Sequence, residues 1–328
     1  MKGFWKQIRY RIEWILLKFA AAVVPKVPRS LLLRLADMLA GIAWCLDRRS
    51  RAVAMENLSA VFGGEDGWDE KRIGRTAKDS FRYFARAMID LFWSPRLDQE
   101  KAAALIRYDE KEFAPFDETV KDGAILLTPH YGNFEWIAYG MGFRGHQFCI
   151  IAQDFKNGRL TEIFSQLRSG SGHEVIRQEG AMLKLMRQLK KGGLAAFLPD
   201  LTVKPSQAAT VIECFGLKAS VTLLHAVLAQ RTRKPMYGGV AVPQPDGTYL
   251  MRGISDFGIE EDDSLQVIAQ KCWDKFEPII RENPAPWLWM YKHWRYRPRG
   301  DEGEKYPTYA NYSKAFDRLC EESFTSSE

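Results

Sequence analysis

The stretch Gly123-Ala-Ile-Leu-Leu-Thr-Pro-His-Tyr-Gly-Asn-Phe-Glu135 contains both a strand signal and a helix signal. Its short apolar run, Ala124 to Thr128, predicts a buried strand, because runs of this length are typical of strands and helices are longer. Asn133 is a favourable N-cap, so a helix is predicted over residues 133–142. His130 would then lie in a strand-to-helix turn at the carboxyl end of a strand. Open α/β sheets bind their ligands at that end.

The segments that follow continue this alternation of strands and helices. The pattern predicts an α/β fold with a central mostly parallel sheet flanked by helices. The sequence before it, residues 50–106, is predicted to be helical with a turn around Gly64. Further strands are expected over 148–152, 174–177, 194–198 and 210–213, helices over 159–168, 181–191, 219–231 and 264–282, and a strand pair within 235–252.

The first 46 residues are predicted to form two helices separated by Pro25 and Pro28. The first carries aromatic and aliphatic residues at helical spacing together with several cations, which is typical of helices at a membrane interface. Alternatively, both helices cover the protein's own core. No run of 18 uncharged apolar residues is present. A cleaved signal peptide is a further alternative, but Lys18 interrupts the apolar run. The aromatic and aliphatic residues at helical spacing in the first helix are Trp5, Ile8, Ile12, Ile15, Leu16 and Phe19, and its cations are Lys2, Lys6, Arg9 and Arg11.

Composition sets further bounds on the protein. Its 328 residues are 46% hydrophobic and 27% charged, which is typical of a globular chain with a large core. The net charge of +6 suits an anionic membrane, nucleic acid or a phosphorylated substrate. The five cysteines are scattered and form no CxxC pair, so free thiols in a reducing compartment are expected. No HExxH motif occurs, and no metal site is predicted.

The chemistry suggested by the central stretch is that of a general base. Histidine titrates near neutral pH and can accept a proton from a hydroxyl. A carboxylate on its other ring nitrogen would fix the tautomer, and the turn is expected to let Glu135 reach back to His130. No GxSxG elbow is present, so direct attack by an acceptor hydroxyl is the simplest mechanism. Alternatively, the stretch is only a capped helix beside a satisfied histidine, because the HxxxxE spacing is common.

The same stretch closely resembles the late lipid A acyltransferase family, whose signature is an apolar strand followed by His-aromatic-Gly-Asn-aromatic-Glu. The resemblance covers most of the chain. The family commonly has Gln after its acidic residue, whereas Leu201 follows Asp200 here. Further matching segments are Arg51–Phe62 with Asn57, Ile176–Gly193, Phe197–Asp200, Phe215–Gly216 with Ala219 and Ser220, and Trp287–Pro298.

The resemblance implies a glycerolipid acyltransferase-like fold and transfer of a fatty acyl group from acyl carrier protein. The acceptor would be a hydroxyl of a lipid A precursor at the cytoplasmic face of the inner membrane. It implies no metal and no cofactor beyond the acyl-carrier co-substrate. Its partners would be acyl carrier protein, the lipid acceptor and an anionic membrane surface. The catalytic residues would be His130 and Glu135, and substrate contacts would come from Asn133, Arg177, Asp200 and Gly216.

On this basis the chain divides into a membrane-associating helical region (1–46), an acyltransferase catalytic domain (47–300) and a polar, loosely held C-terminal tail (301–328). Other functions stay open: the same transfer to another membrane glycolipid or aminolipid, a thioesterase, or a non-catalytic membrane-binding protein. Arg168 and Arg177 could each bind a phosphate or simply be solvated. The aromatic and basic segment 287–299 could stack on nucleic acid, but no RNA-binding motif accompanies it, and no nucleic-acid partner is expected.

Overall fold

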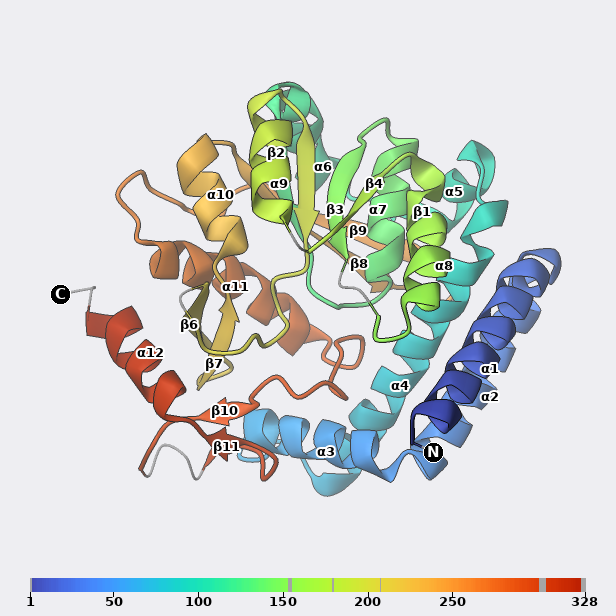
Figure 1. Cartoon of the computed structure of the whole chain (residues 1–328), viewed down its shortest axis with the longest axis horizontal. Coiled ribbons are helices and arrows are strands. Elements are labelled where there is room, and N and C mark those ends of the chain that lie inside the picture. The colour runs from blue at the N-terminus through green and yellow to red at the C-terminus, as the bar shows by residue number, and fades with distance from the viewer. Residues whose placement is uncertain (1, 153–154, 179, 207, 301–304, 326–328) are drawn as a thin grey trace.

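A seven-stranded sheet forms the centre of the computed structural model, which describes residues 2–152, 155–178, 180–206, 208–300 and 305–325 (Figure 1). All neighbouring strands are parallel except β8 and β9, which confirms the predicted mostly parallel sheet. In spatial order the strands are β1 (Ile106–Tyr108), β9 (Tyr249–Ile254), β8 (Met236–Pro243), β2 (Ala124–Leu127), β5 (Leu194–Phe197), β3 (Phe148–Ala152) and β4 (Glu174–Arg177).

Helices cover both faces of this sheet, and strand β2 shows why. All four of its residues are buried. Successive side chains of a strand point to opposite faces of the sheet, and helices cover both faces here. Ile125 and Leu127 join a core cluster with α9 (Ala181–Lys190), α10 (Leu224–Thr232) and α11 (Leu265–Glu282). Ala124 and Leu126 join a second cluster with α6 (Glu110–Thr119), α7 (Phe134–Phe143) and α8 (Gly158–Arg168). The apolar run of β2 therefore reflects burial on both sides.

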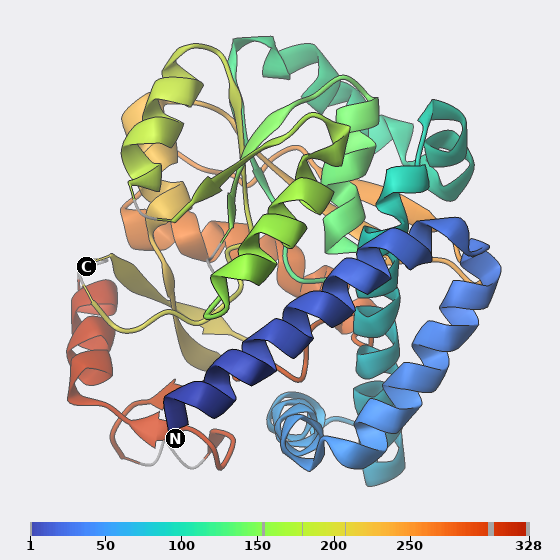
Figure 2. The same ribbon diagram turned by 45° about the vertical axis from the view of Figure 1, so that its right-hand side comes forward.

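The N-terminal helices α1 (Lys2–Val23) and α2 (Arg29–Leu46) lie on the outside of the molecule, as Figure 2 shows. Helix α2 packs along α4 (Glu70–Trp93), and the inner side of α1 buries Trp14 and Leu17 against the second core cluster. Their other sides form an apolar outer face. It consists of Phe4, Trp5, Ile12, Ile15, Leu16 and Phe19 on α1, and Leu31, Leu35, Met38, Leu39, Ile42 and Leu46 on α2.

Covering the protein's own core thus accounts for only one side of these two helices. No helix in the described parts of the chain is long and apolar enough to cross a membrane. The remaining helices before the sheet are α3 (Arg48–Phe62) and α5 (Gln99–Leu105). Together with α4 they confirm the predicted helical character of residues 50–106 as far as Leu105, since β1 begins at Ile106.

Two predictions are wrong. The helix expected over 219–231 begins only at Leu224, because β6 (Ala209–Cys214) and β7 (Leu217–Thr222) form an antiparallel hairpin. Its turn residues Phe215 and Gly216 both have positive φ, as tight hairpin turns require. The C-terminal segment is not loosely held throughout. It forms β11 (Asn311–Tyr312), which pairs with β10 (Tyr296–Arg297), and α12 (Lys314–Thr325), whose apolar side packs against β6.

Candidate functional site

The carboxyl ends of β2 and β5 bring together a histidine and an aspartate. The two strands are adjacent and parallel, with Leu127 paired to Phe197. His130 is the third residue after β2, and Asp200 is the third after β5. The imidazole Nδ1 of His130 lies 2.8 Å from Asp200 Oδ1, and the backbone N–H of His130 donates to Oδ2 at 2.8 Å. Strand register therefore builds a His–Asp pair at the edge where the sequence predicted the site.

The carboxylate of Asp200 is sealed inside the protein. Its side chain is 0% exposed, and Oδ2 accepts a further hydrogen bond from the indole N–H of Trp287 at 3.0 Å. Burial alone would raise the pKa of Asp200. The charge and hydrogen bonds of His130 outweigh that effect and hold the pKa below its usual value. Asp200 is thus an anion that His130 and Trp287 stabilise. Its side chain faces His130 and Trp287, and its predicted contact with substrate stays a prediction.

The segment from Trp287 to Trp294 forms the wall behind Asp200. The ring of His293 stacks on Trp287 with centroids 3.9 Å apart, and burial lowers the pKa of His293 to about 4. Ser80 on α4 donates to the carbonyl of Trp287 at 2.6 Å. Asn57 on α3 donates to the carbonyls of Trp289 and Tyr291 at 2.7 and 2.8 Å. Buried polar groups on the helices before the sheet therefore fix the residue that holds Asp200.

Glu135 does not reach the imidazole as predicted. It lies in the first turn of α7, where both of its oxygens bind the guanidinium of Arg168 on α8, at 2.9 Å to Nε and 2.5 Å to Nη2. Asp200 already occupies Nδ1 of His130. A bidentate Arg–carboxylate pair is strong and directional, so Glu135 is committed to Arg168. The sequence prediction chose the carboxylate nearest in the chain, whereas the fold supplies one from the neighbouring strand.

The turn after His130 is held by backbone and side-chain contacts. Gly132 has a φ of +58°, and a Cβ there would lie 1.8 Å from the carbonyl oxygen of Ala241 on β8. Asn133 caps α7 by accepting from the N–H of Trp136 at 3.1 Å, which confirms its predicted N-cap role. Its amide group donates to Asp90, and its side chain is fully buried. Asn133 therefore positions the turn, and its substrate contact stays a prediction.

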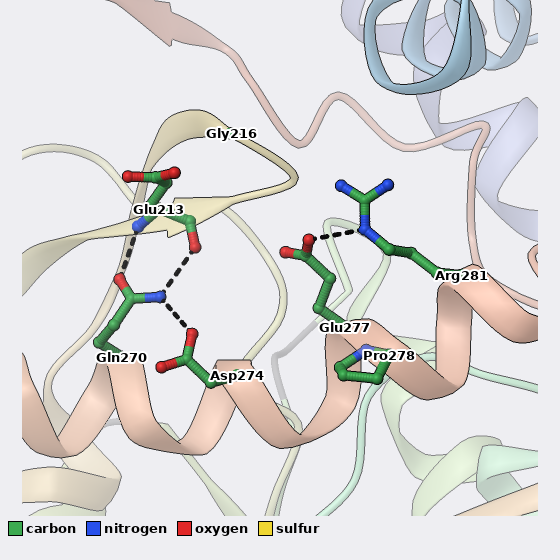
Figure 3. A pocket seen from close by; sticks show the side chains of 7 residues that line it. All are labelled: Glu213, Gly216, Gln270, Asp274, Glu277, Pro278 and Arg281. Carbon is green, nitrogen blue, oxygen red and sulfur yellow. Dashed lines mark hydrogen bonds and ion pairs between the residues drawn. The ribbon is translucent and has the colours of Figure 1, made fainter. Parts of the chain in front are cut away.

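The other two predicted binding residues lie apart from the imidazole. Arg177 ends β4 with an exposed side chain at the same edge of the sheet, but β3 and β5 separate β4 from β2. Its substrate contact stays a prediction. Gly216, at the tip of the β6–β7 hairpin, lines a cavity of about 570 Å³ (Figure 3). None of the residues described as lining this cavity belongs to the hydrogen-bond network around His130. The lining residues are Glu213, Gly216, Gln270, Asp274, Glu277, Pro278 and Arg281.

The geometry assigns the protons in the pair. An ionised carboxylate can only accept, so Nδ1 of His130 carries the hydrogen and Nε2 has the free lone pair. The His130 side chain keeps 15% of its surface exposed while Asp200 keeps none. A substrate can therefore meet the imidazole but not the carboxylate. This is the arrangement of a general base with a buried orienting partner.

Comparison with known families places the chain in one of them. A comparison with curated proteins finds no match for the chain. The sequence model for bacterial lipid A biosynthesis acyltransferases matches residues 1–296, which include His130, Asp200 and Trp287. The match covers both N-terminal helices, the whole central sheet and the wall behind Asp200. The chain therefore belongs to the bacterial lipid A biosynthesis acyltransferase family.

Proposed function

We propose that the protein transfers a fatty acyl group from acyl carrier protein to a hydroxyl of a lipid A precursor, with His130 as the general base. The observation that carries this proposal is the His130–Asp200 pair, in which a buried carboxylate orients a partly exposed imidazole. The acceptor hydroxyl gives its proton to Nε2 while its oxygen attacks the thioester carbonyl carbon. The carbon–sulfur bond then breaks, and the imidazolium returns the proton to the departing thiolate. The products are an ester and a free carrier thiol.

In this mechanism Asp200 stabilises the imidazolium that forms during attack, because its charge lies 2.8 Å from Nδ1. Glu135 acts through Arg168. The carboxylate fixes the guanidinium at the start of α7, and we propose that the oriented guanidinium contacts an oxygen of the substrate. Arginine is suited to this role since its planar donors match phosphate and carboxylate groups. No acyl-enzyme intermediate is part of the proposal.

The apolar outer face of α1 and α2 supports a position at the inner membrane's cytoplasmic face. Twelve large apolar side chains are exposed on these two helices, from Phe4 to Leu46. Lys6, Arg9 and Lys18 lie on the same helix as half of them. Apolar side chains next to cations suit the boundary between acyl chains and anionic headgroups. A lipid acceptor could then reach the site from the membrane surface.

Purified protein incubated with acyl-loaded carrier protein and a lipid A precursor tests the proposal. Mass spectrometry should show the acceptor gaining one acyl group, and His130→Ala should lower the rate by at least about 10²-fold. Free fatty acid released at the same rate without acceptor would instead indicate a thioesterase. Equal kcat/KM with acyl-coenzyme A, independent of salt, would contradict the carrier protein as donor.

A further inference from the structure

A buried ion pair connects the elbow between α1 and α2 to the core of the molecule. Arg29 is the first residue of α2, directly after Pro28. Its Nε and Nη2 atoms bind the two oxygens of Asp90 on α4 at 2.7 and 2.8 Å. The side chains of Arg29 and Asp90 are 10% and 0% exposed. Nη1 of Arg29 donates to the carbonyl of Gly247 in the β8–β9 turn at 2.8 Å. The elbow is therefore anchored at both α4 and the sheet.

The same carboxylate also holds the turn that carries His130. Asp90 Oδ2 accepts hydrogen bonds from Asn133 Nδ2 at 3.1 Å and from the hydroxyl of Tyr249 at 2.7 Å. The backbone carbonyl of Asp90 accepts from the indole N–H of Trp136 at 3.2 Å. Asn133, in the turn after His130, and Trp136, in the first turn of helix α7, thus depend on Asp90 for their position. Asn133 is only three residues from His130. Asp90 therefore links Arg29, at the N-terminal elbow, directly to the turn that carries His130.

We infer that Arg29 and Asp90 are positioning residues for acyl transfer, which hold Asn133 and thereby keep His130 aligned with Asp200. This inference rests on the proposed function of His130. Stability alone is a weak explanation for the pair, because desolvation of a buried ion pair offsets most of its Coulombic gain. A fixed catalytic turn does need such support, since misplacement by about 1 Å can cost roughly 10²-fold in rate.

The chain offers a matched control. Arg86 on α4 and Asp37 on α2 form a second bidentate pair, with both N–O distances 2.6 Å. It joins the same two helices as Arg29 and Asp90, but it is more exposed, at 24% and 37%, and contacts neither Asn133 nor Trp136. Arg29→Lys and Arg86→Lys therefore remove the same fork geometry from the same helix pair. A third variant, Asn133→Ser, keeps an N-cap oxygen and removes the amide NH₂ that donates to Asp90, in a shorter side chain.

The experiment measures kinetics and hydrogen exchange on the full-length protein at a temperature where all variants are folded. Arg29→Lys and Asn133→Ser should lower kcat about 10- to 100-fold, with KM changed less than about twofold. They should also speed exchange of the amides in residues 130–136. Arg86→Lys should leave kcat and exchange at the wild-type level.

Two results would overturn the inference. One is wild-type kcat and exchange in Arg29→Lys with only a lower melting temperature, which would make the pair merely structural. The other is an equal loss of activity and protection in Arg86→Lys. Failure of the proposed function looks different, because the wild-type protein would then show no acyl transfer at all. The exchange data would still decide whether Arg29 holds the turn.

Discussion

Replacing Asp200 by asparagine probes the centre of the site, because the carboxylate accepts three hydrogen bonds from fixed donors. Oδ2 receives the backbone N–H of His130 and the indole N–H of Trp287, and Oδ1 faces Nδ1 of His130. Asparagine has only one acceptor oxygen. If this oxygen keeps the two donors at the Oδ2 position, the amide NH₂ must face Nδ1. Nδ1 then becomes an acceptor, the ring proton moves to Nε2, and Nε2 can no longer take a proton from the acceptor hydroxyl.

The expected loss follows from this change of tautomer. The corresponding Asp→Asn change in Ser-His-Asp triads costs about 10⁴-fold in kcat. We expect Asp200→Asn to lose about 10³- to 10⁴-fold here, or roughly 4 to 5 kcal/mol of barrier. Stability should fall much less, by about 1 to 3 kcal/mol, because the amide oxygen keeps two of the hydrogen bonds and a neutral N–H to Nδ1 bond replaces the charged third one.

The assay is acyl transfer to a micellar lipid A precursor, with circular dichroism to confirm folding. Asp200→Asn should be far more damaging than Glu135→Gln. The double variant of Asp200→Asn with His130→Ala should be hardly worse than His130→Ala alone, since the two residues act as one unit. Retention of more than a tenth of the activity in Asp200→Asn, together with a 10³-fold loss in Glu135→Gln, would refute the assignment of Asp200 as the partner of His130.

Three further outcomes are expected. Glu135→Gln and Arg168→Gln should each lower kcat/KM by about 10-fold, and the double variant should be no worse, because breaking the pair from either side removes one interaction. Exchanging Leu16 and Phe19 on the apolar outer face for Ser should lower the affinity for anionic vesicles, measured by co-sedimentation, at least about tenfold, since each exposed side chain can bury apolar area in lipid. The free energy of unfolding in urea should decrease as the pH falls from about 6.5 to 4. Burial lowers the pKa of His225 to about 4 in the folded protein, so the unfolded chain takes up the proton first. This difference in pKa lowers the free energy of unfolding by about 3 kcal/mol across this window.

Each of these has its own contradicting result. Additive losses from Glu135→Gln and Arg168→Gln would show that the two side chains act separately. Leu183→Ser on α9 is the matched control for membrane binding, because Leu183 is 63% exposed but lies outside the apolar outer face. An equal effect of that substitution would remove the specific role of α1. A His225→Met variant should lose part of the acid sensitivity, and an unchanged pH dependence would assign it to other groups.

The sequence predicted the features that depend on local pattern. Strand β2, the cap at Asn133 and the following helix are encoded within 20 consecutive residues, 124–143, so a short apolar run and the capping rule predict them. The partner of His130 could not be found in that way. Asp200 lies 70 residues away, and its contact with His130 depends on β5 being inserted beside β2, which no local pattern specifies. A usable signal did exist, because both residues follow predicted strands at the same edge of the sheet.

The β6–β7 hairpin shows the opposite limit. Residues 219–231 have an acceptable helical composition, but the turn at Phe215 and Gly216 pairs residues 217–222 with the preceding strand. Tertiary pairing therefore overrides local propensity there. The segment after Gly300 is polar on average, and this average hides the apolar side of α12 at Phe316 and Leu319. Average composition does not reveal an amphipathic helix.

The His130–Asp200 pair also constrains the number of residues between each strand and the side chain that follows it. Each residue follows its strand by the same number of positions, and the two strands are in register at Leu127 and Phe197. One inserted residue in either turn would shift the side chain that follows it by up to about 3.3 Å, the length of one extended residue. The 2.8 Å hydrogen bond would break although both residues were still present. The pair is thus encoded partly as spacing, which a substitution scan cannot detect and a scan of single-residue insertions and deletions would reveal.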